Sequence, residues 1–333
     1  MKRILSLSLC LLLTAGFSAF AGGGTEGGSG KSVIKVASYF ADSHPASIVM
    51  AGTFKPMVEK NSGGAITVEL YPNNMLGAEA EFIDGIKMGN VEMGLLGTML
   101  GSQFPALMCI EFPSLFGSAQ EASDILNTMV DQICAGMDAV NIKGLGISIN
   151  GVRAVSNSVR PINSFEDMRG LKLRVPQVEH YVEMGKVWNV NGVTMPMSEL
   201  FTAMQQKTID GQENPPTTVL ASGWFEVQKY IAVTNHCVAG NLVTIGKKYW
   251  DSLSPANQKV VQDAASAFAK EETALYIKNA EADIETLKSK GLTITYPDTK
   301  PFIDSMKPVL QQFCVKYPRL KEMVDIINSK KKS

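Results

Sequence analysis

The chain has 333 residues, and 45% of them are hydrophobic, which is enough to bury one large core or two of ordinary size. Its 31 basic residues nearly balance 32 acidic ones, and the formal net charge is −1. This balance argues against nucleic acid or an anionic membrane surface as the partner, because both select strongly basic surfaces.

The N-terminus has the composition of an export signal followed by a linker. Lys2 and Arg3 precede an apolar run at 4–15, and Ala19 and Ala21 form a small-x-small cleavage site. We predict a cleaved signal peptide at 1–21, with an uncleaved anchor as the alternative, and a flexible Gly/Ser tether at 22–31. Removing Lys2 and Arg3 from the 31 basic residues leaves 29 against 32 acidic ones, a net charge of about −3. No later stretch has about eighteen consecutive apolar residues, so the mature chain is predicted to be soluble and not membrane-spanning.

Neither the cysteines nor the histidines form a metal-binding or redox pattern. The four cysteines after the predicted signal are far apart and lack a CxxC pair. We expect free, buried thiols, and one disulfide of undetermined pairing stays open as an alternative. The histidines at 44, 180 and 236 lack HxH or HExxH spacing, so neither a metal nor a cofactor is predicted.

The first part of the mature chain alternates short apolar strands with helices. The pattern predicts strands at 34–38, 65–71 and 91–96 and helices at 46–61 and 79–88. Such alternation is typical of a largely parallel sheet with helices on both faces. Ligands bind beyond the carboxyl ends of such strands, which here are followed by residues 39–44, 77–81 and 97–100.

The second part continues the alternation and ends in a long helix. Residues 107–116 are apolar and predict packing. The further predicted elements are helices at 120–141 and 200–206, a helix starting at 219–227, and strands at 144–150, 171–175 and 237–245. Ser254 caps a helical run at 255–290, with Pro255 in its first position. At 1.5 Å per residue this run is about 50 Å long, which exceeds one small domain.

Arg174 is the strongest candidate for binding chemistry. It lies in the strand at 171–175, which Pro176 ends, so its side chain is held at a strand terminus. A fixed guanidinium offers two parallel N–H groups to a carboxylate, which predicts an anion pocket. The common alternative is a structural ion pair with a neighbouring acid. Residues 210–215 are expected to form a tight loop that ends in an amide and a proline.

Several segments, in order along the chain, resemble the periplasmic solute-binding subunit of tripartite ATP-independent (TRAP) transporters, the DctP-like family. The resemblance covers nearly everything after residue 32. The matching segments are YPNNMLG (71–77), NGVR (150–153), INSFEDMRGLKLRVP (162–176), MSELFTAMQQ (197–206), DGQENP (210–215), FEVQKY (225–230) and LSPANQKVVQDAA (253–265).

The resemblance implies an α/β, periplasmic-binding-protein-like fold with two lobes, a ligand cleft between them and a long helix that spans both. Lobe one would comprise 32–150 and 240–279, and lobe two 151–239 and 280–333. Such a protein is a periplasmic monomer that closes its lobes on a small organic acid and delivers it to a TRAP membrane permease for ion-driven uptake.

The resemblance also implies which residues contact the ligand. Arg174 matches the arginine that pairs with the ligand carboxylate, Arg153 a second arginine that assists it, and Asn214 an amide that bonds the ligand. More variable lining positions fall at Gln177, Met197, Tyr39, Glu79 and Thr98.

The segment at 97–100 narrows the choice of ligand. The sialic-acid-binding branch carries an acid and an arginine there, whereas this chain has Gly-Thr-Met-Leu. A ligand group left without a polar partner costs about 1–3 kcal/mol, which disfavours sialic acid. A C4-dicarboxylate, a keto acid and a sugar acid remain open.

No catalytic constellation was found in the sequence. There is no GxSxG motif and no phosphate-binding loop, and Asp210 and Glu213 have no nucleophile to serve as acid and base. We therefore predict a protein that is not an enzyme. The alternative functions are an exported enzyme, or a sensor that presents its ligand to a membrane receptor with the same cleft.

Overall fold

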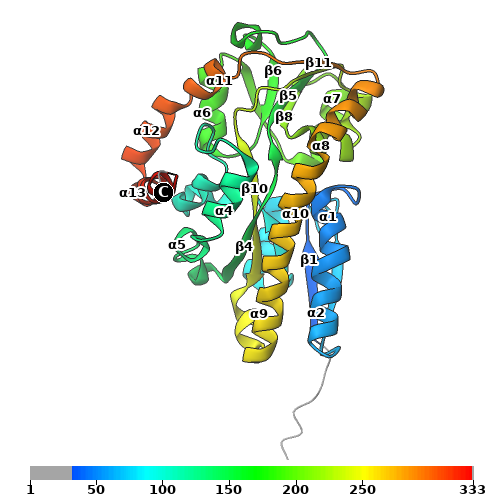
Figure 1. The fold of residues 1–333 in the computed structure, drawn as a ribbon, viewed down its shortest axis with the longest axis vertical. Helices are drawn as coiled ribbons and strands as arrows, with labels where there is room; N and C mark the ends of the chain where they lie inside the picture. The colour runs from blue at the N-terminus through cyan, green and yellow to red at the C-terminus, as the bar shows by residue number, and fades with distance from the viewer. Residues whose placement is uncertain (1–31, 332–333) are drawn as a thin grey trace, which may run out of the picture. The chain divides into compact units, whose positions relative to one another are not determined.

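The computed structural model describes residues 32–331. The predicted signal peptide at 1–21 and the predicted tether at 22–31 lie outside the described residues. Within them, the strands form two sheets (Figure 1). Sheet A has the order β2-β1-β3-β10-β4, and sheet B has the order β11-β9-β5-β8-β6-β7.

Sheet A is mixed rather than purely parallel. Its strands are β1 (Ser32–Ala37), β2 (Ile66–Tyr71), β3 (Met93–Leu96), β4 (Ile142–Val152) and β10 (Val238–Gly246). β1 pairs in parallel with β2 and β3, as predicted, but β10 runs antiparallel to both β3 and β4. The reversal arises because β10 enters sheet A from sheet B and so runs against the first three strands.

Sheet B is built from short strands, most of which the sequence did not indicate. They are β5 (Ala154–Asn157), β6 (Lys172–Val175), β7 (Asn191–Thr194), β8 (Gly211–Asn214), β9 (Tyr230–Ala232) and β11 (Thr293–Thr295). The loop predicted at 210–215 is wrong, because this segment forms β8 between β5 and β6. All four residues of β8 are buried although three are polar, so the strand has no apolar alternation to reveal it.

Helices cover both faces of sheet A. On one face lie α1 (Pro45–Val49), the π-helical turn at Met50–Phe54, α2 (Lys55–Asn61) and part of α10, and the other is contacted by α3 (Glu79–Met88) and a 3₁₀ helix at Pro105–Ile110. The helix predicted at 79–88 is confirmed, and it ends at Gly89, which has a left-handed backbone with φ 85°.

The single helix predicted at 120–141 is wrong. The segment contains α4 (Ala119–Leu126), α5 (Val130–Ile133) and a 3₁₀ turn at Met137–Val140. The break follows from Asn127, whose side chain donates to the carbonyl of Ile147 at 2.7 Å and accepts from its N–H at 3.0 Å. This amide pairs with the edge of β4 as a neighbouring strand would, and the chain turns away from the helical path.

Most of the remaining helices cover sheet B and the C-terminal part of the chain, and one of them, α9 (Lys247–Ser252), packs against β4 and β10 of sheet A. They are α6 (Glu179–Val187), α7 (Leu200–Gln205), α8 (Pro216–Ala221), α9 (Lys247–Ser252), α11 (Lys300–Asp304), α12 (Lys307–Lys316) and α13 (Pro318–Lys330), with 3₁₀ turns at Met99–Ser102, Phe165–Met168, Met197–Glu199 and Trp224–Glu226. The helix expected to start at 219–227 differs from prediction, since α8 begins earlier and Gly223, with φ 69°, separates it from a 3₁₀ turn.

The long helix is confirmed as α10 (Pro255–Ser289), and Ser254 caps it by accepting the N–H of Asn257 at 3.2 Å. α10 contacts β4 of sheet A, then α8, and finally β11 of sheet B, a path that Figure 1 shows in yellow and orange. The chain passes from sheet A to sheet B after Val152 and returns between Ala232 and Val238. The lobe boundaries given above stay predictions.

The four cysteines after the predicted signal are free thiols, as expected, but the expected burial is found for only two of them. Cys109 and Cys237 are buried, whereas Cys134 and Cys314 are partly exposed. Burial raises the pKa of the Cys109 and Cys237 thiols, so both stay protonated and unreactive.

Candidate ligand-binding site

A cavity lies where strands of both sheets end. Tyr39 and Thr98 follow the carboxyl ends of β1 and β3. Arg174 is the second-last residue of β6, and Asn214 is the last residue of β8. About 80 Å³ is open to the centres of water-sized molecules, several times the roughly 10–15 Å³ that one water needs. The structure brings together the ligand-contact residues that the sequence predicted, all of which line this cavity: Tyr39, Glu79, Thr98, Arg153, Arg174, Gln177, Met197 and Asn214.

Arg174 is buried and held by a backbone group. Its Nε and Nη2 donate to the carbonyl oxygen of Met195 at 3.0 and 2.8 Å. Among residues 32–331, no carboxylate lies within 4.0 Å of this guanidinium, so the structural ion pair considered above is not formed. Burial lowers the pKa of Arg174 to about 10, which leaves it charged at neutral pH. A buried cation without a charged partner is a site for an anion.

Arg153 is equally buried, but carboxylates engage it. Its Nε donates to Oε2 of Glu213 at 2.5 Å, and its Nη2 donates to Oε1 and to the backbone oxygen of Glu213, both at 2.7 Å. Its Nη1 lies 3.7 Å from Oε1 of Glu111. The pair is therefore the bidentate fork that planar guanidinium and carboxylate groups favour.

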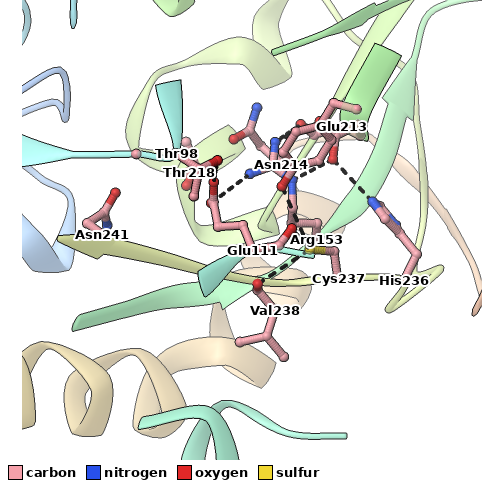
Figure 2. A network of polar contacts seen from close by, with 12 residues as sticks. Thr98, Glu111, Arg153, Glu213, Asn214, Thr218, His236, Cys237, Val238 and Asn241 are labelled. Carbon is pink, nitrogen blue, oxygen red and sulfur yellow. Dashed lines mark hydrogen bonds and ion pairs between the residues drawn. The ribbon is translucent and has the colours of Figure 1, made fainter. Parts of the chain in front are cut away.

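Glu213 extends this arrangement to a histidine. Its Oε2 accepts a hydrogen bond from Nε2 of His236 at 3.1 Å, and Nδ1 of His236 lies 2.8 Å from the hydroxyl of Thr234. Burial lowers the pKa of His236, so the ring is neutral, with its proton on Nε2 and the Thr234 hydroxyl donating to Nδ1. Figure 2 shows the resulting chain of contacts from His236 through Glu213 and Arg153 to Glu111 and Thr98.

The carboxyl groups of the cavity differ in their pKa values. Burial by itself would raise the pKa of Glu213, but Arg153 and His236 outweigh it and hold the value at about 2. For Glu111, burial outweighs the attraction of the more distant Arg153 and raises the pKa to about 7. Burial likewise raises the pKa of Glu79 to about 7, although the N–H of Gly97 donates to it at 2.7 Å.

Hydrogen bonds fix the orientation of several lining side chains. The hydroxyl of Tyr39 donates to Oδ1 of Asn241, and that of Thr98 donates to Glu111 at 3.1 Å. Nδ2 of Asn214 donates to the side-chain oxygen of Gln212 at 2.5 Å. Gln177 and Met197 line the cavity from the segments after β6 and β7.

Sequence reasoning missed several residues of the site. Glu111 and Asn150 line the cavity, and Glu213, which was considered only as an acid or base, neutralises Arg153. A usable signal existed for Glu111, since it is the one charged residue in the apolar run at 107–116 and charged residues are seldom buried without a partner. The Oδ1 of Asn150 is buried and has no hydrogen-bond partner among the described residues.

Two sheets that share one arginine-lined cavity, with a long helix alongside both, define the class of two-lobed solute-binding proteins. Residues 36–316 match the family model described as bacterial extracellular solute-binding protein, family 7. The chain belongs to this family. The predicted family, fold class and role as a solute-binding protein are thereby confirmed, and the family is one of binding proteins rather than enzymes.

Known relatives cover most of the chain. The sialic acid-binding periplasmic protein SiaP of Vibrio cholerae is 31% identical over 77% of this chain and 80% of that protein. The 2,3-diketo-L-gulonate-binding periplasmic protein YiaO of Escherichia coli is 29% identical over 80% of this chain and 83% of that protein. A crystal structure of a TRAP periplasmic solute-binding protein from Haemophilus influenzae with bound L-gulonate is 34% identical, with a TM-score of 0.85 over 90% of this chain and 99% of that one.

Within residues 32–331, every helix is too short or too polar to span a bilayer.

Proposed function

We propose that this protein captures a hydroxylated monocarboxylate of the sugar-acid class outside the cytoplasm and delivers it to a TRAP-type permease. The observation that carries the proposal is Arg174, a buried guanidinium that lines the cavity and whose hydrogen-bond partner in the described part of the chain is a carbonyl oxygen. A ligand carboxylate supplies the missing charge, and a planar acid matches the remaining N–H groups of the fork.

The rest of the cavity is suited to hydroxyl groups. Glu79, Glu111 and the unpartnered oxygen of Asn150 all accept hydrogen bonds, and ligand hydroxyls donate them. A second carboxylate in the ligand would instead face Glu79 and Glu111, and it would find no second available guanidinium because Arg153 is already paired with Glu213. Of the three ligand classes left open by the sequence, this favours a sugar acid over a C4-dicarboxylate. The L-gulonate bound by the Haemophilus influenzae relative supports the same choice.

The proposal is tested by calorimetry on the mature protein with a small panel of compounds. We expect L-gulonate or another six-carbon sugar acid to bind, and the matching neutral lactone and succinate to bind far more weakly. The lactone retains most hydroxyls but lacks the carboxylate, so equal binding of acid and lactone would contradict the role of Arg174. Preferential binding of succinate would contradict the sugar-acid class.

A further inference from the structure

The charged groups around the cavity do not balance once an anion is bound. Arg153 and Glu213 form a contact pair and cancel each other. Arg174 is then the remaining cation of the cavity, whereas Glu79 and Glu111 are two further carboxyl groups in its lining. An ionised ligand would place three negative groups against one guanidinium in a site where Arg174 is 6% exposed and Glu111 7%.

The surroundings of Glu111 offer little compensation for a negative charge. Thr98 donates to Oε2 at 3.1 Å, and Arg153 approaches Oε1 only at 3.7 Å because Glu213 already occupies its fork. A backbone N–H of Gly240 also contributes. The other titratable groups that act on or with Glu111 are Glu79, Glu213, Tyr39, His180, Tyr181 and Cys237.

Glu79 is less satisfied still. Its Oε1 accepts the N–H of Gly97 at 2.7 Å, and Oε2 has no hydrogen-bond partner among the described residues. The charged and titratable groups that face Glu79 are Arg174, Glu111 and Tyr39. When a ligand carboxylate takes the guanidinium of Arg174, Glu79 loses the cation that offsets its charge. Glu79 is half-buried and Glu111 is buried. A carboxylate shielded from water and without a cation is costly, and such a group binds a proton instead.

We propose that the cavity takes up protons together with its anionic ligand, and that Glu79 and Glu111 are the groups that hold them. The inference rests on the proposed function, because it needs an anion at Arg174. With the ligand paired to Arg174 and both carboxyl groups protonated, the buried charges sum to zero. A protonated Glu79 also becomes a donor, so it can serve a ligand oxygen as well as a hydroxyl.

The protonation equilibria set the size of the effect. Since the pKa values of Glu79 and Glu111 in the ligand-free protein are about 7, the two groups together hold roughly one proton at pH 7. A bound anion raises both values, so net uptake is up to about one proton at pH 7, near zero at pH 5 and closer to two at pH 9. For each proton taken up on binding, the association constant falls tenfold when the pH rises by one unit. Affinity is therefore constant below about pH 6, where both carboxyl groups are already protonated, and falls as the pH rises above about 7.

The experiment is calorimetry of L-gulonate binding to the mature protein at pH 7.5 in phosphate, HEPES and Tris, whose ionisation enthalpies differ. The slope of the observed enthalpy against the buffer's ionisation enthalpy gives the number of protons taken up. We expect a slope of about one and a slope near zero at pH 5. Tight binding with a buffer-independent enthalpy at pH 7.5 would overturn the inference but leave the proposed function standing. Absence of binding by the whole sugar-acid panel would overturn the proposed function instead.

Variants then locate the protons. Glu79→Gln and Glu111→Gln should each reduce the uptake, and the double variant should bind with a slope near zero and an affinity independent of pH. The matched control is Glu272→Gln. Glu272 lies on α10, is fully buried and has a pKa raised to about 7 by burial, but it does not line the cavity. We expect the control to retain the wild-type slope. Loss of the slope in the control alone would move the proton to Glu272 and overturn the assignment.

Discussion

The cavity contains two buried arginines in opposite electrostatic situations. In the Arg153 centre, which comprises Arg153, Glu213, Glu111 and His236, Nε and Nη2 of the guanidinium are bound to the Glu213 carboxylate and Nη1 lies 3.7 Å from Glu111. In the Arg174 centre, which comprises Arg174, Met195 and Glu79, a single carbonyl oxygen orients the guanidinium and leaves its charge without a close partner. The difference teaches that burial alone does not identify a binding arginine. A binding arginine is identified by its acceptors, since a carbonyl oxygen can position a guanidinium without cancelling its charge.

Removing the arginine side chain should therefore have different effects in the two centres. Loss of the Arg153 side chain leaves the Glu213 carboxylate buried without a cation, with only the hydrogen bond from His236, so its effect falls on folding. Loss of the Arg174 side chain leaves no carboxylate that was paired with it, so its effect falls on binding. The sequence resemblance treats both arginines as ligand contacts, and the variants below separate them.

The largest effect on folding is expected from Arg153→Met. Breaking a buried ion pair by removing one partner costs about 3–5 kcal/mol in the free energy of unfolding. Urea denaturation monitored by fluorescence measures it, and Arg174→Met is the matched control with the same side-chain change. A loss of equal size in the two variants would contradict the distinction between the centres.

The largest effect on binding is expected from Arg174→Ala. Truncating one half of a desolvated charged pair costs about 2–5 kcal/mol, which is roughly thirty- to several-thousand-fold in affinity. Arg174→Lys should recover little, because an ammonium lacks the planar fork. Arg153→Ala should weaken binding less, because Arg153 is already paired with Glu213. Calorimetry with L-gulonate decides among these, and near-native affinity in Arg174→Ala would make Arg174 structural.

Lowering the pH should destabilise the fold through Glu213 in the Arg153 centre. The pKa of the Glu213 carboxyl is about 2 in the folded protein, whereas an unperturbed glutamate, as in the unfolded chain, has a pKa of 4.5. A depressed pKa contributes stability that is complete above pH 4.5 and is lost as the pH falls toward 2, by at most about 3 kcal/mol. The difference in unfolding free energy between wild type and Glu213→Gln should therefore shrink between pH 5 and pH 2.5.

The same measurement on Glu272→Gln should run in the opposite direction. The pKa of Glu272 is raised to about 7 from 4.5, so ionising this buried carboxyl destabilises the fold as the pH rises from 4.5 to 7. The variant should gain stability relative to wild type over that interval. A pH-independent difference for either glutamate would show that its charge does not change on unfolding.

The smallest effect is expected from Ser254→Ala, which lies outside both centres. Removing the N-cap of α10 costs about 1 kcal/mol, because the N–H of Asn257 loses its acceptor. The unfolding free energy should fall by this amount, while L-gulonate affinity stays at the wild-type value. This variant shows what a modest loss of stability does to binding by itself. A large loss of affinity here would mean that the binding data for the arginine variants report stability.

Local patterns predicted the fold where short-range chemistry decides it. The helix at 79–88 ends at Gly89 because only a residue free of a Cβ takes φ 85° without strain. α10 was found from its cap and its length, and β6 from its alternation and Pro176. The prediction failed at Asn127, whose side chain breaks a helix by pairing with a strand twenty residues away in sequence. Such a pairing has no signature in the helix itself.

The binding site was predictable to a different depth. Arg174 was found from its position at a strand end, and the other lining residues from the family resemblance. The strand β8 was missed because Gln212, Glu213 and Asn214 are polar and buried together, against the usual relation between polarity and exposure. Their burial is tolerated because each side chain has a hydrogen-bond partner: Gln212 bonds Ser156, Glu213 bonds Arg153 and His236, and Asn214 donates to Gln212 within the strand.

The sequence by itself determined the class of fold, the long helix and the presence of an arginine at the end of a strand. These depend on periodicity, caps and proline, which act over a few residues. Only the tertiary structure decided which arginine is free. Glu213 is sixty residues from Arg153 in sequence and in contact with it in space, whereas Arg174 meets a carbonyl oxygen instead. The charge available to a ligand depends on these distant partners, because a guanidinium that already holds a carboxylate offers little to a second one.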